Sequence, residues 1–142
     1  MKTALPISAV VLLALAPSAV AAPQINTGTD LVAVCEPYSK LDESAASNAA
    51  TPDRCRHYLT DFLTAFIEAE KLKLDAAARG LPAGEPSPCI RLPDRLTYRD
   101  LAKRVVAMAW HDPDLLNGSA AMLVKRTLEH DFPCPTDPKA PS

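Results

Sequence analysis

Aromatic residues make up only 5% of this 142-residue chain, and glycine occurs four times. No segment shows the alternation of apolar and polar residues that marks a half-buried strand, so the sequence predicts no sheet. A glycine-rich phosphate loop and the G-x-S-x-G turn of serine hydrolases are also absent. We therefore expect an all-α protein that is not an enzyme and holds no cofactor.

Charge gives no sign of a nucleic-acid partner. The chain has 15 Lys and Arg against 17 Asp and Glu, with no basic cluster and no RNA-binding aromatic motif. Its long apolar run, residues 4–16, is too short to remain in a bilayer as a helix, so we expect no membrane span.

The N-terminus has the pattern of an export signal. Lys2 precedes the apolar run, and small residues follow it up to Ala19-Val20-Ala21. We predict a cleavable signal peptide over residues 1–21 and a periplasmic mature protein. Without Lys2, 14 basic residues face 17 acidic ones, a net charge of about −3.

The mature chain has the length of one domain. We place this domain at residues 22–134, followed by a disordered tail at 135–142. Apolar residues recur at helical spacing in four segments, which are residues 28–37, 51–78, 98–110 and 119–130. The sequence thus predicts a small domain of four to five helices, and a loop or frayed turn at residues 39–50.

Helix ends and faces can also be predicted. We expect Thr29 or Asp30 to cap the first helix, Thr51 to cap the second, and Gly80 to end the second. The apolar face of the second helix begins at Cys55 and continues to Leu72 or Leu74, so we expect Cys55 to face the core from the first turn.

All four cysteines lie downstream of the export signal, at Cys35, Cys55, Cys89 and Cys134. An even number in an oxidising compartment predicts two disulfides. Pairing of neighbours, Cys35 with Cys55 and Cys89 with Cys134, closes the shortest loops, although the count also allows two other pairings. Zinc binding is disfavoured because no C-x-x-C pair is present, and we expect no metal.

The histidines His57, His111 and His130 each have a charged neighbour in sequence. Adjacent side chains on a helix diverge by about 100°, so we interpret the histidines as surface or helix-end residues without a catalytic role.

Residues 80–93 are rich in proline and form a stiff loop. Such a loop loses little entropy when a partner immobilises it, and it could enter an active-site cleft. As candidate partner-binding residues we take Leu81, Glu85, Ile90 and Arg91. The alternative is a structural connector held by Cys89.

Several short sequences occur together along nearly the whole mature chain. They are Leu31-Val-Ala-Val-Cys35, Cys55-Arg-His-Tyr58, Cys89-Ile-Arg-Leu-Pro93, Trp110-His111-Asp-Pro113 and Phe132-Pro-Cys134. This combination resembles the Rap1a/Tai family of periplasmic immunity proteins. The resemblance implies an all-α, disulfide-bearing protein that binds and occludes a peptidoglycan amidase delivered by type VI secretion, often as a homodimer.

Two other functions remain open. The family's fold is similar to that of small periplasmic acid-stress chaperones, which expose apolar surface when the pH falls. Two disulfides argue against such opening. The third alternative is an envelope adaptor protein without a toxin partner.

Overall fold

The computed structural model describes residues 24–47, 53–82, 84 and 88–134. These residues form five α-helices and one 3-10 helix, and within them the only strand-like pairings are two isolated bridges. The elements are α1 (Gly28–Ser39), α2 (Glu43–Ser47), α3 (Arg54–Ala78), α4 (Tyr98–His111), η1 (Pro113–Leu116) and α5 (Ala120–Asp131). The all-α prediction is confirmed, while the expected signal peptide and tail lie outside the described residues.

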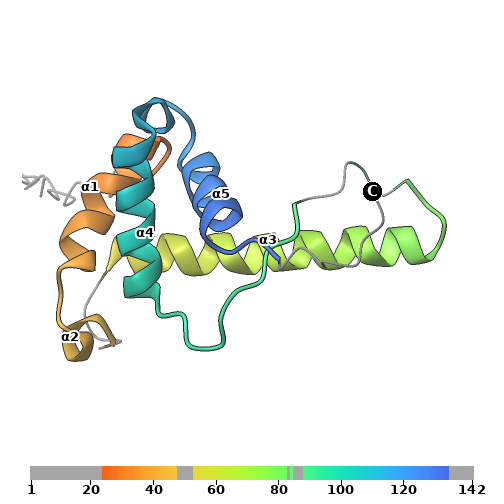
Figure 1. The fold of residues 1–142 in the computed structure, drawn as a ribbon, viewed down its shortest axis with the longest axis horizontal. Coiled ribbons are helices and arrows are strands. Elements are labelled where there is room, and N and C mark those ends of the chain that lie inside the picture. Colours follow the sequence, from red (N-terminus) through yellow and green to blue (C-terminus); the bar gives the residue numbers. More distant parts are fainter. Residues whose placement is uncertain (1–23, 48–52, 83, 85–87, 135–142) are drawn as a thin grey trace, which may run out of the picture.

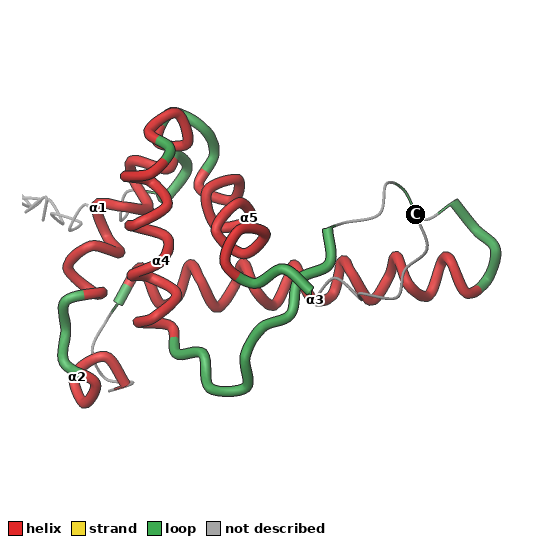
Figure 2. The backbone as a smooth tube through the Cα atoms, viewed as in Figure 1, coloured by secondary structure: helices red, strands yellow, loops and turns green. Residues whose placement is uncertain are grey.

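The helices form a compact body from which one helix projects. In the body, α4 packs against α1, α5 and α3, and α1 also contacts α3 and α5. The first part of α3 lies along this body, and its second part extends beyond the other helices (Figure 1). The same arrangement is clear in the backbone tube (Figure 2). We call residues 66–81 the arm.

The core follows the helical periodicity of α4 and α5. Residues that recur every three or four positions on these two helices are buried: Leu101, Val105, Met108, Ala109, Ala120, Leu123, Val124, Thr127 and Leu128. The Thr127 hydroxyl is satisfied there, because it donates a hydrogen bond of 2.8 Å to the Leu123 carbonyl. A period of 3.6 residues with small and aliphatic side chains is thus sufficient to specify this part of the core.

The expected caps were wrong for the first helix. The Thr27 hydroxyl accepts a hydrogen bond from the Asp30 amide, and the Asp30 carboxylate accepts one from the Thr27 amide. This is a complete capping box, which begins α1 before Thr29. Asp53 caps α3 by accepting from the Arg56 amide, and the expected cap Thr51 lies outside the described residues.

The loop expected at residues 39–50 contains a short helix, α2, so that prediction was wrong for Glu43–Ser47. The Asp42 carboxylate accepts hydrogen bonds of 2.7 Å from the Ala45 amide and the Ser44 hydroxyl, which starts the helix. The buried Tyr38 side chain then donates from its hydroxyl to the Ala46 carbonyl and holds α2 against α1.

The apolar face predicted for α3 is buried only in the first part of the helix, and Cys55 faces the core there as expected. Only Cys55 and Leu59 are fully buried on this helix, whereas Leu72 and Leu74 are 69% and 70% exposed. The arrangement of the helices explains the difference: α4 crosses α3 near the first part of α3 and does not run along it (Figure 1). The body therefore leaves the arm uncovered.

Gly28 provides a sharp test of the packing between α1 and η1. A Cβ atom at this position would lie 2.2 Å from the Leu115 carbonyl oxygen and 2.9 Å from the Leu116 Cα atom, and both are backbone atoms. We expect Gly28→Ala to lower the free energy of unfolding by about 2 kcal/mol in a denaturant titration. Gly118→Ala is the control, since its Cβ would be 3.6 Å from the Leu115 carbonyl oxygen. Equal stability of the two variants would contradict this packing.

Candidate functional site

The two disulfides join the neighbouring cysteines, as expected. Cys35 and Cys55 are fully buried, and their bond, with Cα atoms 4.8 Å apart, connects α1 to the first turn of α3. Cys89 and Cys134 lie nearer the surface, with Cα atoms 5.4 Å apart, and connect the proline-rich loop to the chain after α5. Both separations are ordinary for disulfides.

The second disulfide lies between two short segments of the chain, residues 89–91 and 132–134, which are also joined by backbone hydrogen bonds. The Arg91 amide donates to the Phe132 carbonyl at 2.9 Å, and the Cys134 amide donates to the Cys89 carbonyl at 3.2 Å. Ile90 and Pro133 form an isolated antiparallel bridge between these bonds. The C-terminal end of the loop is therefore fixed to the body, and its N-terminal end is fixed by α3.

The four candidate partner-binding residues do not form one compact patch. Leu81 is 55% exposed at the end of the arm, and Arg91 is exposed on the body. Ile90 is half-buried against the core, while Glu85 lies outside the described residues. The described ends of the loop, residues 80–82 and 88–93, are far apart (Figure 1).

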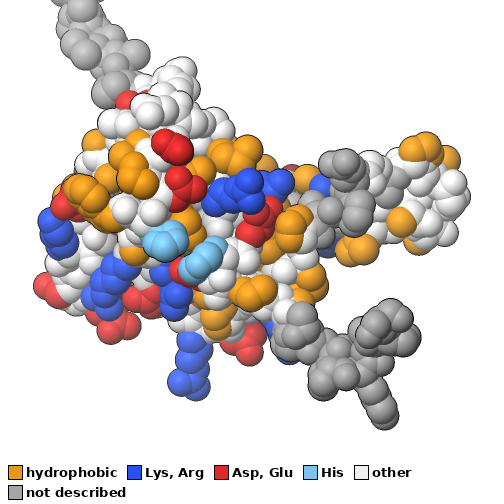
Figure 3. Space-filling view, turned by 45° about the horizontal axis from the view of Figure 1, so that its top comes forward, with side chains coloured by type: hydrophobic (Ala, Val, Ile, Leu, Met, Phe, Trp, Pro, Cys, Tyr) orange, Lys and Arg blue, Asp and Glu red, His pale blue; other side chains and the backbone are white. Residues whose placement is uncertain are grey.

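The arm carries apolar side chains that belong to the apolar face predicted for this helix. Ile67 and Leu74 are 50% and 70% exposed, and their spacing of seven residues places them on the same side of α3. Leu72 lies on another side of the helix. Figure 3 shows apolar side chains on this projecting part of the molecule. Ile67 and Leu74 thus leave one side of the arm with two aliphatic side chains open to water.

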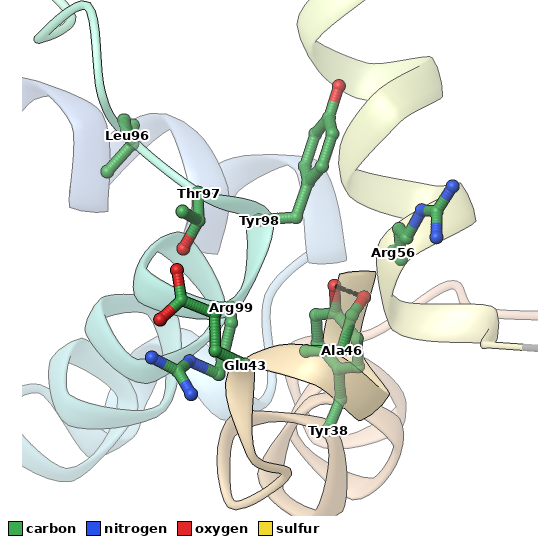
Figure 4. Close-up of a pocket in the computed structure, with 8 residues that line it drawn as sticks. All are labelled: Tyr38, Glu43, Ala46, Arg56, Leu96, Thr97, Tyr98 and Arg99. Atoms are coloured by element: carbon green, nitrogen blue, oxygen red, sulfur yellow. Dashed lines mark hydrogen bonds between the residues drawn. The ribbon is translucent and has the colours of Figure 1, made fainter. Parts of the chain in front are cut away.

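Two adjoining hollows lie where α1, α2 and α3 meet the start of α4. The first, of about 260 Å³, is lined by Tyr38, Glu43, Ala46, Arg56, Leu96, Thr97, Tyr98 and Arg99 (Figure 4). The second, of about 180 Å³, is lined by Leu63, Leu92, Pro93, Leu96, Thr97, Tyr98 and Leu101. Both include Leu96, Thr97 and Tyr98, so the hollows adjoin along that segment.

Hydrogen bonds and charge shape the first hollow. The Arg99 guanidinium donates to the Leu41 carbonyl at 3.2 Å, which ties α4 to the α1–α2 connection. Burial, and then the nearby Asp53 carboxylate, raise the pKa of Tyr38, so its hydroxyl stays protonated and keeps its bond to Ala46. Sequence reasoning missed this site because its walls come from four separate segments.

The sequence matches the family model of the Rap1a immunity proteins over residues 27–134. This chain belongs to that family. No curated protein and no solved structure gives a significant match. Membership in an immunity family implies a protein that acts by binding a protein partner. In the described part of the chain, no helix is both long and apolar enough to cross a membrane.

In this Rap1a protein, α4 and α5 bring two histidines together near their C-terminal ends. The rings of His111 and His130 have centroids 6.0 Å apart, and both side chains are exposed (Figure 3). His130 also contacts its neighbour, with Nδ1 2.7 Å from Oδ1 of Asp131. The prediction that the side chains of sequence neighbours diverge was therefore wrong for His130 and Asp131, where Asp131 is the last residue of α5.

The histidine pair offers no recognisable chemistry of its own. Burial raises the pKa of Asp131, but hydrogen bonds from His130 and Arg104 outweigh burial and hold this pKa below its ordinary value. Arg104 lies 3.1 Å from the same carboxylate. Among the described residues, no three His, Cys, Asp or Glu side chains are placed to hold a metal ion together.

Two capping carboxylates contribute, with Asp131, to the loss of stability in acid. Bonds from Thr27 lower the pKa of Asp30, and bonds from Ala45 and Ser44 lower the pKa of Asp42, each below the ordinary value of 3.8. Groups with depressed folded-state pKa values stabilise the fold above the unfolded pKa and lose this effect as the pH falls through the folded pKa. We expect thermal unfolding midpoints to stay constant from about pH 7 to 5 and to fall below about pH 4. Loss of the near-ultraviolet circular dichroism signal at pH 5 would contradict this and favour acid opening.

Proposed function

We propose that this Rap1a protein is a periplasmic immunity protein that binds and inhibits a peptidoglycan amidase effector of type VI secretion. The observation that carries the proposal is the arm, which projects from a disulfide-linked body and leads into a proline-rich loop fixed at both ends. Family membership supplies the immunity function. The arm and loop supply a surface that can occlude a substrate cleft.

Restraint of the loop explains how binding can be tight. Residues 80–93 continue from α3 at one end, and the Cys89–Cys134 disulfide holds the other end. Proline residues further limit the backbone. A segment that is already restrained loses less conformational entropy on binding, so more of the contact energy becomes affinity.

The two disulfides support a periplasmic location. Disulfides persist in oxidising compartments such as the bacterial periplasm, and this chain has two of them. The proposed signal peptide, residues 1–21, would deliver the protein there, where peptidoglycan amidases act.

The exposed side of the arm also favours a homodimer. If two arms cross antiparallel near residues 70–71, Ile67 of one copy lies opposite Leu74 of the other, and Glu68 comes within reach of Lys71. The same surface then serves both copies, as a two-fold interface requires. This arrangement removes both aliphatic side chains from water.

The dimer can be tested by substituting exposed aliphatic residues on two different sides of the arm. We expect the double variant Ile67→Glu/Leu74→Glu to weaken dimerisation roughly a hundredfold in analytical ultracentrifugation, because it places like charges in the apolar contact. Leu72→Glu is the matched control, since Leu72 is 69% exposed but lies on another side. Equal loss of dimer in both variants would show that this side of α3 is not the interface.

Protection of cells tests the proposed function directly. A peptidoglycan amidase effector is directed to the periplasm of a sensitive bacterium, and the full chain is co-expressed. We expect survival with the full chain and lysis with a variant lacking residues 2–21, which keeps the protein in the cytoplasm. Lysis in both cultures, with folded full chain present in the periplasm, would overturn the proposal for that effector.

A further inference from the structure

The two disulfides differ in their exposure to water. Cys35 and Cys55 are fully buried between α1 and α3, so a reductant reaches their sulfur atoms only if the core opens. Cys89 is exposed and Cys134 is half-buried, so their bond is accessible while the protein is folded. Exposed disulfides are more readily reduced than buried structural ones, and disulfides that regulate proteins belong to the exposed kind.

We propose that the Cys89–Cys134 disulfide is a redox latch, whose reduction weakens effector binding while the body stays folded. The inference rests on the proposed function, because the latch holds the C-terminal end of the loop that contacts the effector in that proposal. Reduction frees this end, so the loop must lose more entropy when the effector immobilises it. The latch thus regulates the binding surface by controlling how firmly the loop is held.

Two backbone hydrogen bonds flank the latch. The Arg91 amide donates to the Phe132 carbonyl at 2.9 Å, and the Cys134 amide donates to the Cys89 carbonyl at 3.2 Å. Ile90 lies between these bonds and is half-buried against the core. When the disulfide is broken, these contacts must hold the end of the loop without a covalent link. This end then opens more often, because few buried contacts give a segment low local stability.

The body has contacts of its own that keep it folded when the latch opens. The Gly28 amide donates to the Gly118 carbonyl and the Ala120 amide donates to the Asn26 carbonyl, each at 2.9 Å. These bonds join the start of α1 to the start of α5, and α4 packs against α1, α3 and α5. The buried disulfide still joins α1 to α3. None of these contacts involves the segments that the latch joins.

The latch opens by thiol–disulfide exchange with a dithiol, either a protein with two redox-active cysteines or a small molecule. One thiolate of the dithiol attacks the exposed Cys89 sulfur, the S–S bond breaks, and the Cys134 sulfur leaves and takes up a proton. The second thiol of the dithiol then attacks the mixed disulfide and releases Cys89 as a thiol. The protein gains two electrons and two protons, and the dithiol becomes a disulfide.

Partial reduction tests whether the latch opens alone. The oxidised mature protein is treated with dithiothreitol in the absence of denaturant, free thiols are blocked with iodoacetamide, and peptide mass spectrometry locates the label. We expect Cys89 and Cys134 to be labelled at least tenfold faster than Cys35 and Cys55, because only the latch is accessible in the folded protein. Equal labelling of all four cysteines would overturn the inference.

Hydrogen exchange shows what the open latch releases. In protein alkylated at the latch alone, the Arg91 amide should exchange at least tenfold faster than in the oxidised protein, because its bond to Phe132 has lost the adjoining covalent link. The amides of Gly28 and Ala120 should exchange at unchanged rates. Faster exchange at these two amides would show that reduction opens the body and would overturn the inference.

Effector binding tests the regulation. After removal of dithiothreitol, calorimetry with a peptidoglycan amidase should show at least tenfold weaker binding by the latch-alkylated protein than by the oxidised protein. Cys89→Ala/Cys134→Ala is the control, because it lacks the latch and should bind equally weakly before and after the same treatment. Equal affinity of the oxidised and alkylated proteins would overturn the inference. Failure of the oxidised protein to bind any amidase would refute the proposed function, and labelling and hydrogen exchange would still decide whether the latch opens alone.

Discussion

Replacing Cys35 and Cys55 together with alanine is expected to lower the free energy of unfolding by about 3 kcal/mol. The disulfide closes a 20-residue separation and therefore restricts the unfolded chain. It also holds α1 against the first turn of α3 in the centre of the core, where both sulfur atoms are fully buried. A loss of this size is a large fraction of the stability of an ordinary domain.

Urea titrations of the double variant and the oxidised wild type measure this effect. Cys89→Ala/Cys134→Ala is the comparison: its 45-residue separation predicts a loss of about 4 kcal/mol from loop entropy, but it lies nearer the surface. We expect only the Cys35/Cys55 variant to perturb the near-ultraviolet signal of Tyr38, its close neighbour on α1. Unchanged stability of that variant would show that the buried bond does not hold the two helices together.

Replacing residues 81–87 with a glycine-serine segment of equal length should weaken effector binding at least a hundredfold. The change removes Leu81 and two of the four prolines of the loop, Pro82 and Pro86, and the flexible replacement must lose more entropy when the partner immobilises it. The helices of the body are untouched, so the circular dichroism spectrum and the thermal midpoint should change little. Isothermal titration calorimetry with the effector gives the affinity.

Trp110→Ala is the control for the loop replacement. Trp110 is 72% exposed on α4, so the change removes a large exposed side chain from the body and leaves the arm intact. We expect this variant to bind the effector with wild-type affinity. Loss of binding in Trp110→Ala, with retention in the loop variant, would place the effector site on the body and refute the role of the loop.

Much of the body was predictable from short-range patterns. The buried positions of α4 and α5 repeat every three or four residues, and Ser119, a residue type that favours helix N-caps, caps α5. Disulfide pairing followed because neighbouring cysteines close the shortest loops. These features depend on local geometry and chain entropy, which the sequence contains directly.

The partner-binding surfaces could not be predicted in the same way. The pattern through Leu72 and Leu74 shows that α3 has apolar positions, but it does not show where the other helices cross α3. The hollows at the start of α4 and the His111–His130 pair depend on the packing of separate helices, which short-range patterns do not record. Sequence therefore predicted the helices of the body well, but it did not show that the apolar face of α3 continues beyond the body.

The most direct test of the central claim is a titration of inhibition. The oxidised mature protein is used at neutral pH to capture a secreted peptidoglycan amidase, and the purified amidase is then assayed on cell walls with increasing amounts of the protein. We expect activity to fall linearly and reach zero at equal molar amounts of the two proteins. Full amidase activity at excess protein, with binding of many unfolded proteins only at acid pH, would contradict the immunity function and indicate a chaperone.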